Sequence, residues 1–178
     1  GERPAIGFAR YVPPETDELD ADTGQGQPNF SYGYMAQAIE LTVDTETGHI
    51  RIDKVVSTHD VGRTISPELL RGQVEGAVVQ AHGYVLSENL QVADGVIKNP
   101  RFSSYLIPGI ADVPLEVDTD VLELADPVGP FGARGVAEMP FITYAPAVVA
   151  ALHDATGVWF NEFPLTPSRV LAGLQAFR

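Results

Sequence analysis

Cysteine is absent from this chain of 178 residues. The absence excludes disulfide bonds, thiolate-bound zinc and any iron–sulfur cluster held by this chain. Basic residues are also few, since 11 Lys and Arg stand against 24 Asp and Glu for a formal net charge of -13. Such an acidic chain is a poor candidate for binding nucleic acid or an anionic membrane surface. Long apolar runs are missing too, and none approaches the ~20 residues that a membrane-spanning helix needs.

The remaining composition is that of an ordinary globular protein, with 44% hydrophobic residues, which suffices for one core or two small ones. No N-terminal segment resembles a signal peptide, and we expect a cytoplasmic protein. The chain begins at Gly1 without an initiator Met, which fits a processed or trimmed piece. Four scattered histidines show no metal-ligand spacing, so we interpret them as structural or surface residues and expect no metal ligand in this chain. They are His49, His59, His82 and His153.

The chain divides into two parts by its sequence pattern. Residues 1–30 are rich in Pro, Gly, Asp, Glu and Thr and show neither a helical nor a strand period, which predicts an extended loop or tail. A long irregular segment of this kind is either functional or lies over a neighbour. Residues 31–178 show periodic apolar patterns and are predicted to form the folded part.

The folded part alternates between strand and helix patterns. Apolar residues alternate over residues 32–43 and 49–60 around the turn sequence DTETG, which predicts a β-hairpin. Helical spacing begins at Pro67 and predicts a helix to about Ser87. Further patterns predict, in order, a strand pair over 89–96, a strand over 115–124, a helix over 139–155, a short strand over 158–163 and a last helix from Pro167. This order of elements indicates an α+β fold with about three helices.

The first predicted helix contains three glycines, Gly72, Gly76 and Gly83. Each destabilises a helix interior by ~1 kcal/mol relative to Ala. Close approach of another backbone or of a bound ligand would explain them, and so would plain packing of the helix against its neighbours. The residues alone leave both explanations open. Gln73 follows Gly72 directly, so its amide group would be presented to whatever comes close.

The sequence GARGVAEM, residues 132–139, combines two glycines with one carboxylate, Glu138. Pro140 follows, and proline suits the first turn of a helix because its missing N–H would have no partner there. Glu138 is therefore predicted to lie where a glycine-bearing loop enters a helix, as a candidate general base. The plainer interpretation, which these residues alone favour, is that Glu138 only complements the positive end of the helix dipole.

Four segments in this order resemble the xanthine dehydrogenase/aldehyde oxidase family, the molybdenum hydroxylases, in the C-terminal part of their molybdopterin-binding large subunit. The segments are DTETGHI, DVGRTISP, GQVEG and GVAEMP, at residues 44–50, 60–67, 72–76 and 135–140. Three positions depart from the family's pattern. Ser66 stands where Asn is usual, Ala137 where Gly is commonest, and Arg134 where Lys is frequent.

The resemblance implies the C-terminal portion of the molybdenum-cofactor-binding domain, a β-hairpin and small mixed sheet packed with about three helices. It implies that Glu138 is the general base that takes a proton from a metal-bound hydroxyl group. It also implies that Gly72 and Gln73 contact the pterin cofactor. The backbone of Gly135, Val136 and Ala137 would lie beside the molybdenum. The implied cofactor is molybdopterin or its cytosine dinucleotide form.

The same resemblance implies partners. These are the remainder of the molybdenum subunit and iron–sulfur and flavin (FAD) subunits or domains, with an aldehyde or an N-heteroaromatic compound as the small-molecule substrate. No activity is expected from this chain alone, because part of a pocket neither excludes water nor holds the cofactor. One alternative is a non-catalytic interaction domain derived from this family. Another, a stand-alone acidic domain that binds carbohydrate or protein, leaves the helix glycines unexplained.

Overall fold

The computed structural model describes residues 5–177, and its centre is a three-stranded mixed sheet in the order β1-β2-β5. β1 (Tyr34–Val43) and β2 (Ile50–Asp60) form an antiparallel hairpin. β5 (Glu116–Val121) lies parallel to β2 on its other side. The predicted hairpin and the predicted strand within residues 115–124 are thus confirmed.

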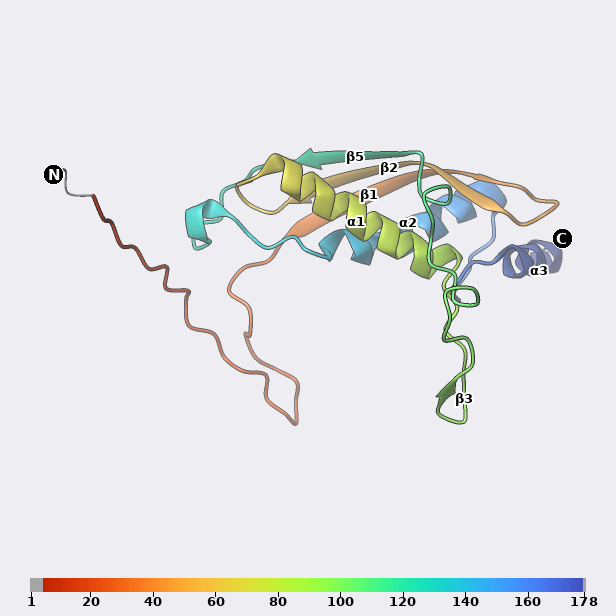
Figure 1. Cartoon of the computed structure of the whole chain (residues 1–178), viewed down its shortest axis with the longest axis horizontal. Coiled ribbons are helices and arrows are strands. Elements are labelled where there is room, and N and C mark those ends of the chain that lie inside the picture. Colours follow the sequence, from red (N-terminus) through yellow and green to blue (C-terminus); the bar gives the residue numbers. More distant parts are fainter. Residues whose placement is uncertain (1–4, 178) are drawn as a thin grey trace.

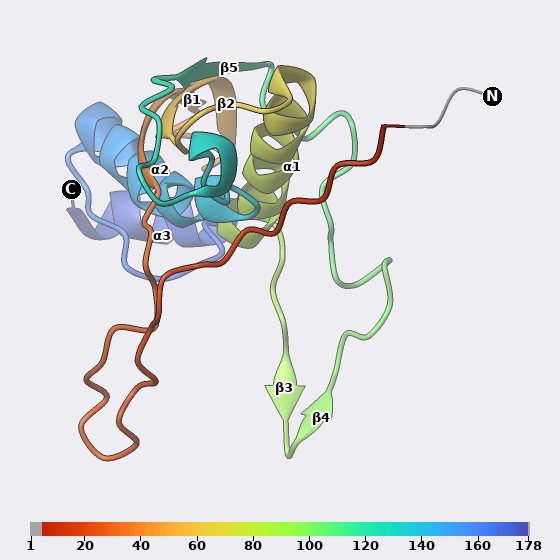
Figure 2. The same ribbon diagram turned by 90° about the vertical axis from the view of Figure 1, so that its left-hand side faces the viewer.

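Helices cover one face of this sheet. α1 (Pro67–Leu86) and α2 (Met139–Thr156) lie side by side beneath it. α3 (Pro167–Phe177) lies near the C-terminal ends of these two helices (Figures 1 and 2). The core fills the space between the sheet and the helices, and its fully buried members include Val55, Val78, Tyr144, Val148 and Leu152. The α+β class with three helices is therefore confirmed. Within residues 5–177 no helix combines the length and apolar character that crossing a membrane requires.

The ends of α2 follow from its sequence. Pro140 lies in the first turn, where its lack of an N–H has no cost. Gly157 ends the helix with a left-handed φ of 76° and donates its N–H to the carbonyl of His153, the usual role of glycine after a helix. The start of this helix is consequently a well-defined place, and the residue directly before it is Glu138.

A short arm connects α1 to β5. It contains β3 (Val92–Ala93) and β4 (Val96–Ile97), which pair antiparallel around Asp94 and Gly95. Both of these residues have positive φ, 52° and 72°, as a two-residue Asp-Gly hairpin turn requires. The strand pair predicted over residues 89–96 is therefore present, but it spans residues 92–97, so it begins three residues later and ends one residue later than predicted.

The strand predicted over residues 158–163 is wrong. That segment has no strand or helix. Its apolar alternation arises because Val158 and Phe160 insert into the core while Trp159 stays exposed. The backbone that follows bonds to a helix end instead of a strand, since the N–H of Leu165 donates to the carbonyl of Val85 at 2.6 Å.

The N-terminal segment, as far as it is described, runs without helix or strand from residue 5 to residue 33 and leaves the folded part as an extended arm (Figures 1 and 2). Phe8 is 93% exposed. Tyr11 contacts the body of the chain, where its hydroxyl donates to the carbonyl of Val128 at 2.7 Å. The division of the chain into residues 1–30 and 31–178 stays a prediction.

Candidate functional site

The loop that precedes α2 is anchored to the end of β2 by backbone hydrogen bonds. The N–H of Arg134 donates to the carbonyl of Val61 at 2.8 Å, and the N–H of Arg63 donates to the carbonyl of Gly132 at 2.7 Å. Gly62 lies between these bonds with a φ of 70°, and a Cβ there would overlap the carbonyl oxygen of Gly132. Only glycine meets both requirements, so the DVG sequence after β2 determines where the loop can dock.

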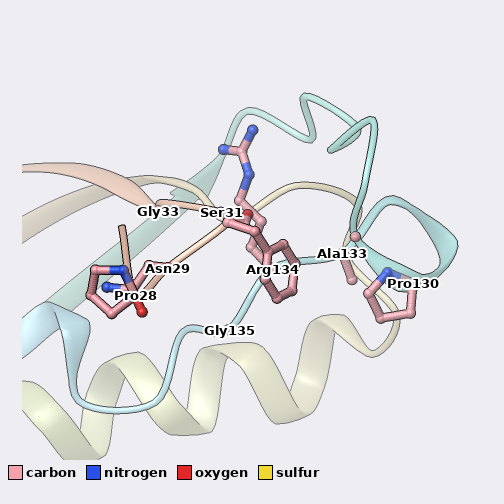
Figure 3. Close-up of a pocket in the computed structure, with 10 residues that line it drawn as sticks. Pro28, Asn29, Ser31, Gly33, Pro130, Ala133, Arg134 and Gly135 are labelled. Atoms are coloured by element: carbon pink, nitrogen blue, oxygen red, sulfur yellow. The ribbon is translucent and has the colours of Figure 1, made fainter. Parts of the chain in front are cut away.

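The side chain of Arg134 adds an ionic anchor. Its Nε lies 2.6 Å from Asp126 Oδ2, and its second ion pair reaches Asp60 Oδ2 at 3.0 Å. Asp126 also accepts a hydrogen bond from the Ser31 hydroxyl at 2.9 Å. Figure 3 shows the guanidinium group of Arg134 turned away from Gly135. Arg134 thus joins the loop directly to the end of β2 and, through Asp126, to the chain entering β1.

Charge pairing changes the titration of this cluster. The Arg134 guanidinium, together with the backbone N–H of Val128, holds the pKa of the Asp126 carboxyl well below its ordinary value. The same contact with Asp126 raises the pKa of Arg134. Both groups therefore stay charged at neutral pH, and the anchor remains an ion pair.

Glu138 lies directly before α2, as predicted, but its side chain does not cap that helix. The carboxylate is exposed and turns toward α1, where Gln80 Nε2 donates to Glu138 Oε1 at 3.3 Å. A role at the positive end of the α2 dipole does not account for the orientation of the carboxylate. In a capping role, the carboxylate would point to the backbone N–H groups of its own helix.

The glycines of α1 fall into two groups. A Cβ at Gly83 would overlap the Glu88 carboxylate and approach the Pro108 ring, so packing explains this glycine. A Cβ at Gly72 or Gly76 would meet nothing within 4 Å among the described residues. Packing among residues 5–177 therefore does not explain the second group, and a close approach from outside these residues is the explanation that remains.

Two neighbouring hollows bring the predicted site residues together. One, of about 290 Å³, is lined by Gln73 of α1 and by Val136. The other, of about 600 Å³, is lined by Gln80, Glu138 and again Val136. Gly135 and Ala137 line the second hollow, whereas Gly72 lines neither. A third hollow of about 360 Å³ lies between residues 28–33 and the loop (Figure 3).

Sequence reasoning missed the contact between Gln80 and Glu138, and it missed the role of Asp126. A signal for Gln80 was present, because Gln73 and Gln80 are seven residues apart and so lie two turns apart on one side of the helix. Nothing in the local sequence announced Asp126. Within residues 5–177 no cluster of three or more His, Asp or Glu side chains has the geometry to hold a metal ion.

This α+β unit turns the amide of Gln73 and the carboxylate of Glu138 toward two adjoining open hollows. A sequence model described as the molybdopterin cofactor-binding domain matches residues 2–114, and the chain belongs to this family. The matched range includes Gly72 and Gln73 but ends before the loop at residues 135–138.

Individual relatives extend the similarity over most of the chain. It is 38% identical over 149 residues to the probable hypoxanthine oxidase XdhD of Escherichia coli (strain K12), covering 83% of this chain and 16% of that protein. It is 31% identical over 173 residues to the xanthine dehydrogenase molybdenum-binding subunit of Escherichia coli O157:H7, covering 93% of this chain and 23% of that one. The solved aldehyde oxidoreductase of Desulfovibrio gigas superposes with a TM-score of 0.82 at 32% identity, over 90% of this chain and 17% of that chain.

These proteins are much longer than this chain, which spans only 16 to 23% of their length. The chain thus corresponds to a small part of each relative.

Proposed function

We propose that this chain forms one wall of a molybdenum–pterin site in a hydroxylase and supplies Glu138 as its general base. The observation that carries the proposal is that Gln73 and Glu138, from separate segments, face adjoining hollows that share Val136. When bound, the cofactor supplies the redox chemistry that adds oxygen from water to a carbon atom of the substrate. The residues of this chain bind, orient and move a proton.

The surface of α1 fits a flat polar ligand. Gln73 is exposed, and its amide offers two N–H donors and one carbonyl acceptor. Gly72 and Gly76 leave the helix backbone bare on an open side, so a ring system can come closer there than over any other residue type. We propose that this surface holds the pterin. Whether the pterin carries a cytosine nucleotide would depend on residues outside this chain.

Glu138 would accept the proton that the attacking oxygen loses. A carboxylate can do this when a loop presents it at the substrate and nothing neutralises it. The hollow around Glu138 supports that role, since no basic side chain lines it. The nearby cation, Arg134, is already paired with Asp126 and Asp60.

The names of the relatives support a proposal for the substrate and partners of the whole protein. Names such as hypoxanthine oxidase, xanthine dehydrogenase and aldehyde oxidoreductase support an N-heteroaromatic compound or an aldehyde as substrate. We propose that iron–sulfur and flavin groups on partner chains or domains take the electrons, because this chain has no cysteine to hold a cluster. A cytoplasmic location stays a prediction.

The test is Glu138→Gln in the assembled molybdenum-loaded enzyme. We expect turnover of hypoxanthine or benzaldehyde to fall by ~10²-fold or more, because an amide accepts no proton at neutral pH. Glu46→Gln makes the same chemical change in the exposed hairpin turn and should leave turnover unchanged. Molybdenum content is measured for both. Near-normal turnover of the loaded Glu138→Gln enzyme would contradict the proposed function.

A further inference from the structure

We infer that Gln80 is the positioning residue of Glu138: its side-chain amide holds the carboxylate in the orientation that proton transfer needs. The inference rests on the proposed function of Glu138. Its central observation is the 3.3 Å hydrogen bond from Gln80 Nε2 to Glu138 Oε1, which joins the middle of α1 to the first residue before α2. It is the one hydrogen bond that the Glu138 side chain makes within residues 5–177.

The position of Gln80 on α1 makes this contact specific. Gly76 lies one turn earlier and Gln73 two turns earlier on the same side of the helix. The two glutamines therefore face successive hollows, Gln73 the smaller one and Gln80 the larger one. Bare backbone at Gly76 separates them. One helix face thus presents one amide to the proposed cofactor surface and another to the proposed base.

Among the residues that line the hollow around Glu138, Gln80 is the one whose side chain can orient the carboxylate by a hydrogen bond. Glu138 is the single charged residue among those that line its hollow, and the lining from α2 is apolar, namely Met139, Phe141 and Ile142. A neutral N–H donor orients the carboxylate through a hydrogen bond without cancelling its charge. A lysine or arginine in the same place would form an ion pair that competes with proton transfer.

The contact does not hold the fold together. Gln80 and Glu138 are both exposed. The packing of α1 on α2 rests instead on buried side chains such as Val78 and Val148, and on the buried hydrogen bond between the Tyr144 hydroxyl and His82 Nδ1 at 2.9 Å. Substitution of Gln80 should therefore leave the structure intact and act on the carboxylate alone.

The experiment compares Gln80→Leu and Gln80→Glu in the assembled molybdenum-loaded enzyme, with hypoxanthine and benzaldehyde as probes. Gln80→Leu removes the donor, and we expect kcat to fall about tenfold, the usual effect of losing a hydrogen bond to a charged group, while KM changes less than threefold. Gln80→Glu puts a second carboxyl group beside the first. Two neighbouring carboxyl groups hold a shared proton to higher pH than one carboxyl group does. In a plot of kcat against pH, the acid limb of the Gln80→Glu enzyme should therefore move to higher pH by about one unit.

Three controls separate the outcomes. Gln91→Glu makes the same change on the exposed arm and should behave as wild type. Molybdenum content per chain should equal that of wild type in every variant. Loss of molybdenum in the Gln80 variants would overturn the inference, because it would show that Gln80 acts by retaining the cofactor. A crystal structure of the Gln80→Leu enzyme should show the Glu138 carboxylate in a changed orientation.

Failure of the inference differs from failure of the proposed function. If Glu138→Gln abolishes turnover while both Gln80 variants keep wild-type kcat and the wild-type pH profile, Glu138 is the base and Gln80 does not position it. Equal losses in Gln80→Leu and Gln80→Glu with no shift of the acid limb would also overturn the inference, because a purely structural role predicts that result. If Glu138→Gln itself turns over normally, the proposed function fails.

Discussion

Ala137 adopts a backbone φ of 27°, in the left-handed region that residues with a Cβ rarely occupy. Such a conformation costs on the order of 1–3 kcal/mol and persists where surrounding structure imposes it. Ala137 lies directly before Glu138, so its backbone conformation sets the direction in which the chain enters α2. A small side chain keeps the cost low, which accounts for alanine at a position where the resembling family commonly has glycine.

Substitutions at Ala137 should follow this conformational cost. Ala137→Gly is expected to keep turnover within about twofold of wild type and to leave the thermal midpoint unchanged or slightly raised, because glycine tolerates positive φ. Ala137→Val should lower both, since a β-branched side chain is strained at positive φ. Thermal unfolding and kcat of the loaded enzyme measure the two effects. Equal behaviour of the two variants would show that the backbone at 137 is not strained.

Arg134 connects three elements around the loop that precedes α2 and ends at Glu138. Its ion pairs reach Asp60 at the end of β2 and Asp126 after β5, and Asp126 in turn accepts from Ser31 before β1. Guanidinium geometry suits two carboxylates better than a lysine ammonium does. The anchor therefore holds the loop at its N-terminal side, while entry into α2 holds the other side.

Arg134→Met should loosen the loop without removing the base. We expect kcat to fall about tenfold with molybdenum content retained, because the position of a general base depends on the contacts that hold its loop in place. Hydrogen exchange of the peptide covering residues 126–138 should become faster. Arg71→Met, on the exposed side of α1, is the matched control. Unchanged exchange in Arg134→Met would show that backbone bonds alone hold the loop.

The same anchor predicts an acid sensitivity. The pKa of Asp126 is lowered in the folded protein, chiefly by Arg134. A lowered carboxyl pKa contributes stability that is fully present above the unfolded value of about 3.9 and is lost as pH falls below it. Protection of residues 126–138 from hydrogen exchange should therefore fall below about pH 4 in wild type. Asp126→Asn should be less protected at pH 7 and should lose little more on acidification, and a parallel acid response of the two proteins would contradict this.

At the scale of the whole molecule, the chain leaves large apolar side chains exposed on several sides. Ile6, Phe8, Phe102 and Ile110 are each more than four-fifths exposed, and the hollows around Gln73 and Glu138 are open. Because the chain spans 16 to 23% of its relatives' length, the remainder of a molybdenum subunit is the expected cover.

Protein purified from its native source should accordingly contain molybdenum and further polypeptide, in one longer chain or in partner chains. The 178-residue chain produced alone should show no turnover of hypoxanthine or benzaldehyde, even after incubation with molybdenum cofactor, because under the proposed function it provides one wall of the site. Metal analysis, an inventory of co-purifying chains and an activity assay measure this. A metal-free single chain from the native source would support the non-catalytic alternative.

Much of this protein was determined by local sequence. Alternating and helical apolar patterns act over a few residues, so the hairpin, the three helices and the place of Glu138 before α2 followed directly from them. Turn chemistry acts locally too, as at Asp94 and Gly95. The ordered motifs also indicated the family that similarity over residues 2–114 then established.

Other features depended on residues far apart in sequence. Whether residues 158–163 form a strand depended on a neighbouring strand to pair with. Among the described residues the strands pair as β1-β2-β5 and β3-β4, so this segment has no strand partner, and its alternation does not reveal that. The contact of Gln80 with Glu138 joins residues 58 apart, and that of Ser31 with Asp126 joins residues 95 apart. Side-chain direction and distance between such residues arise only when the sheet and helices pack, so the tertiary structure alone decided which polar groups meet at the site.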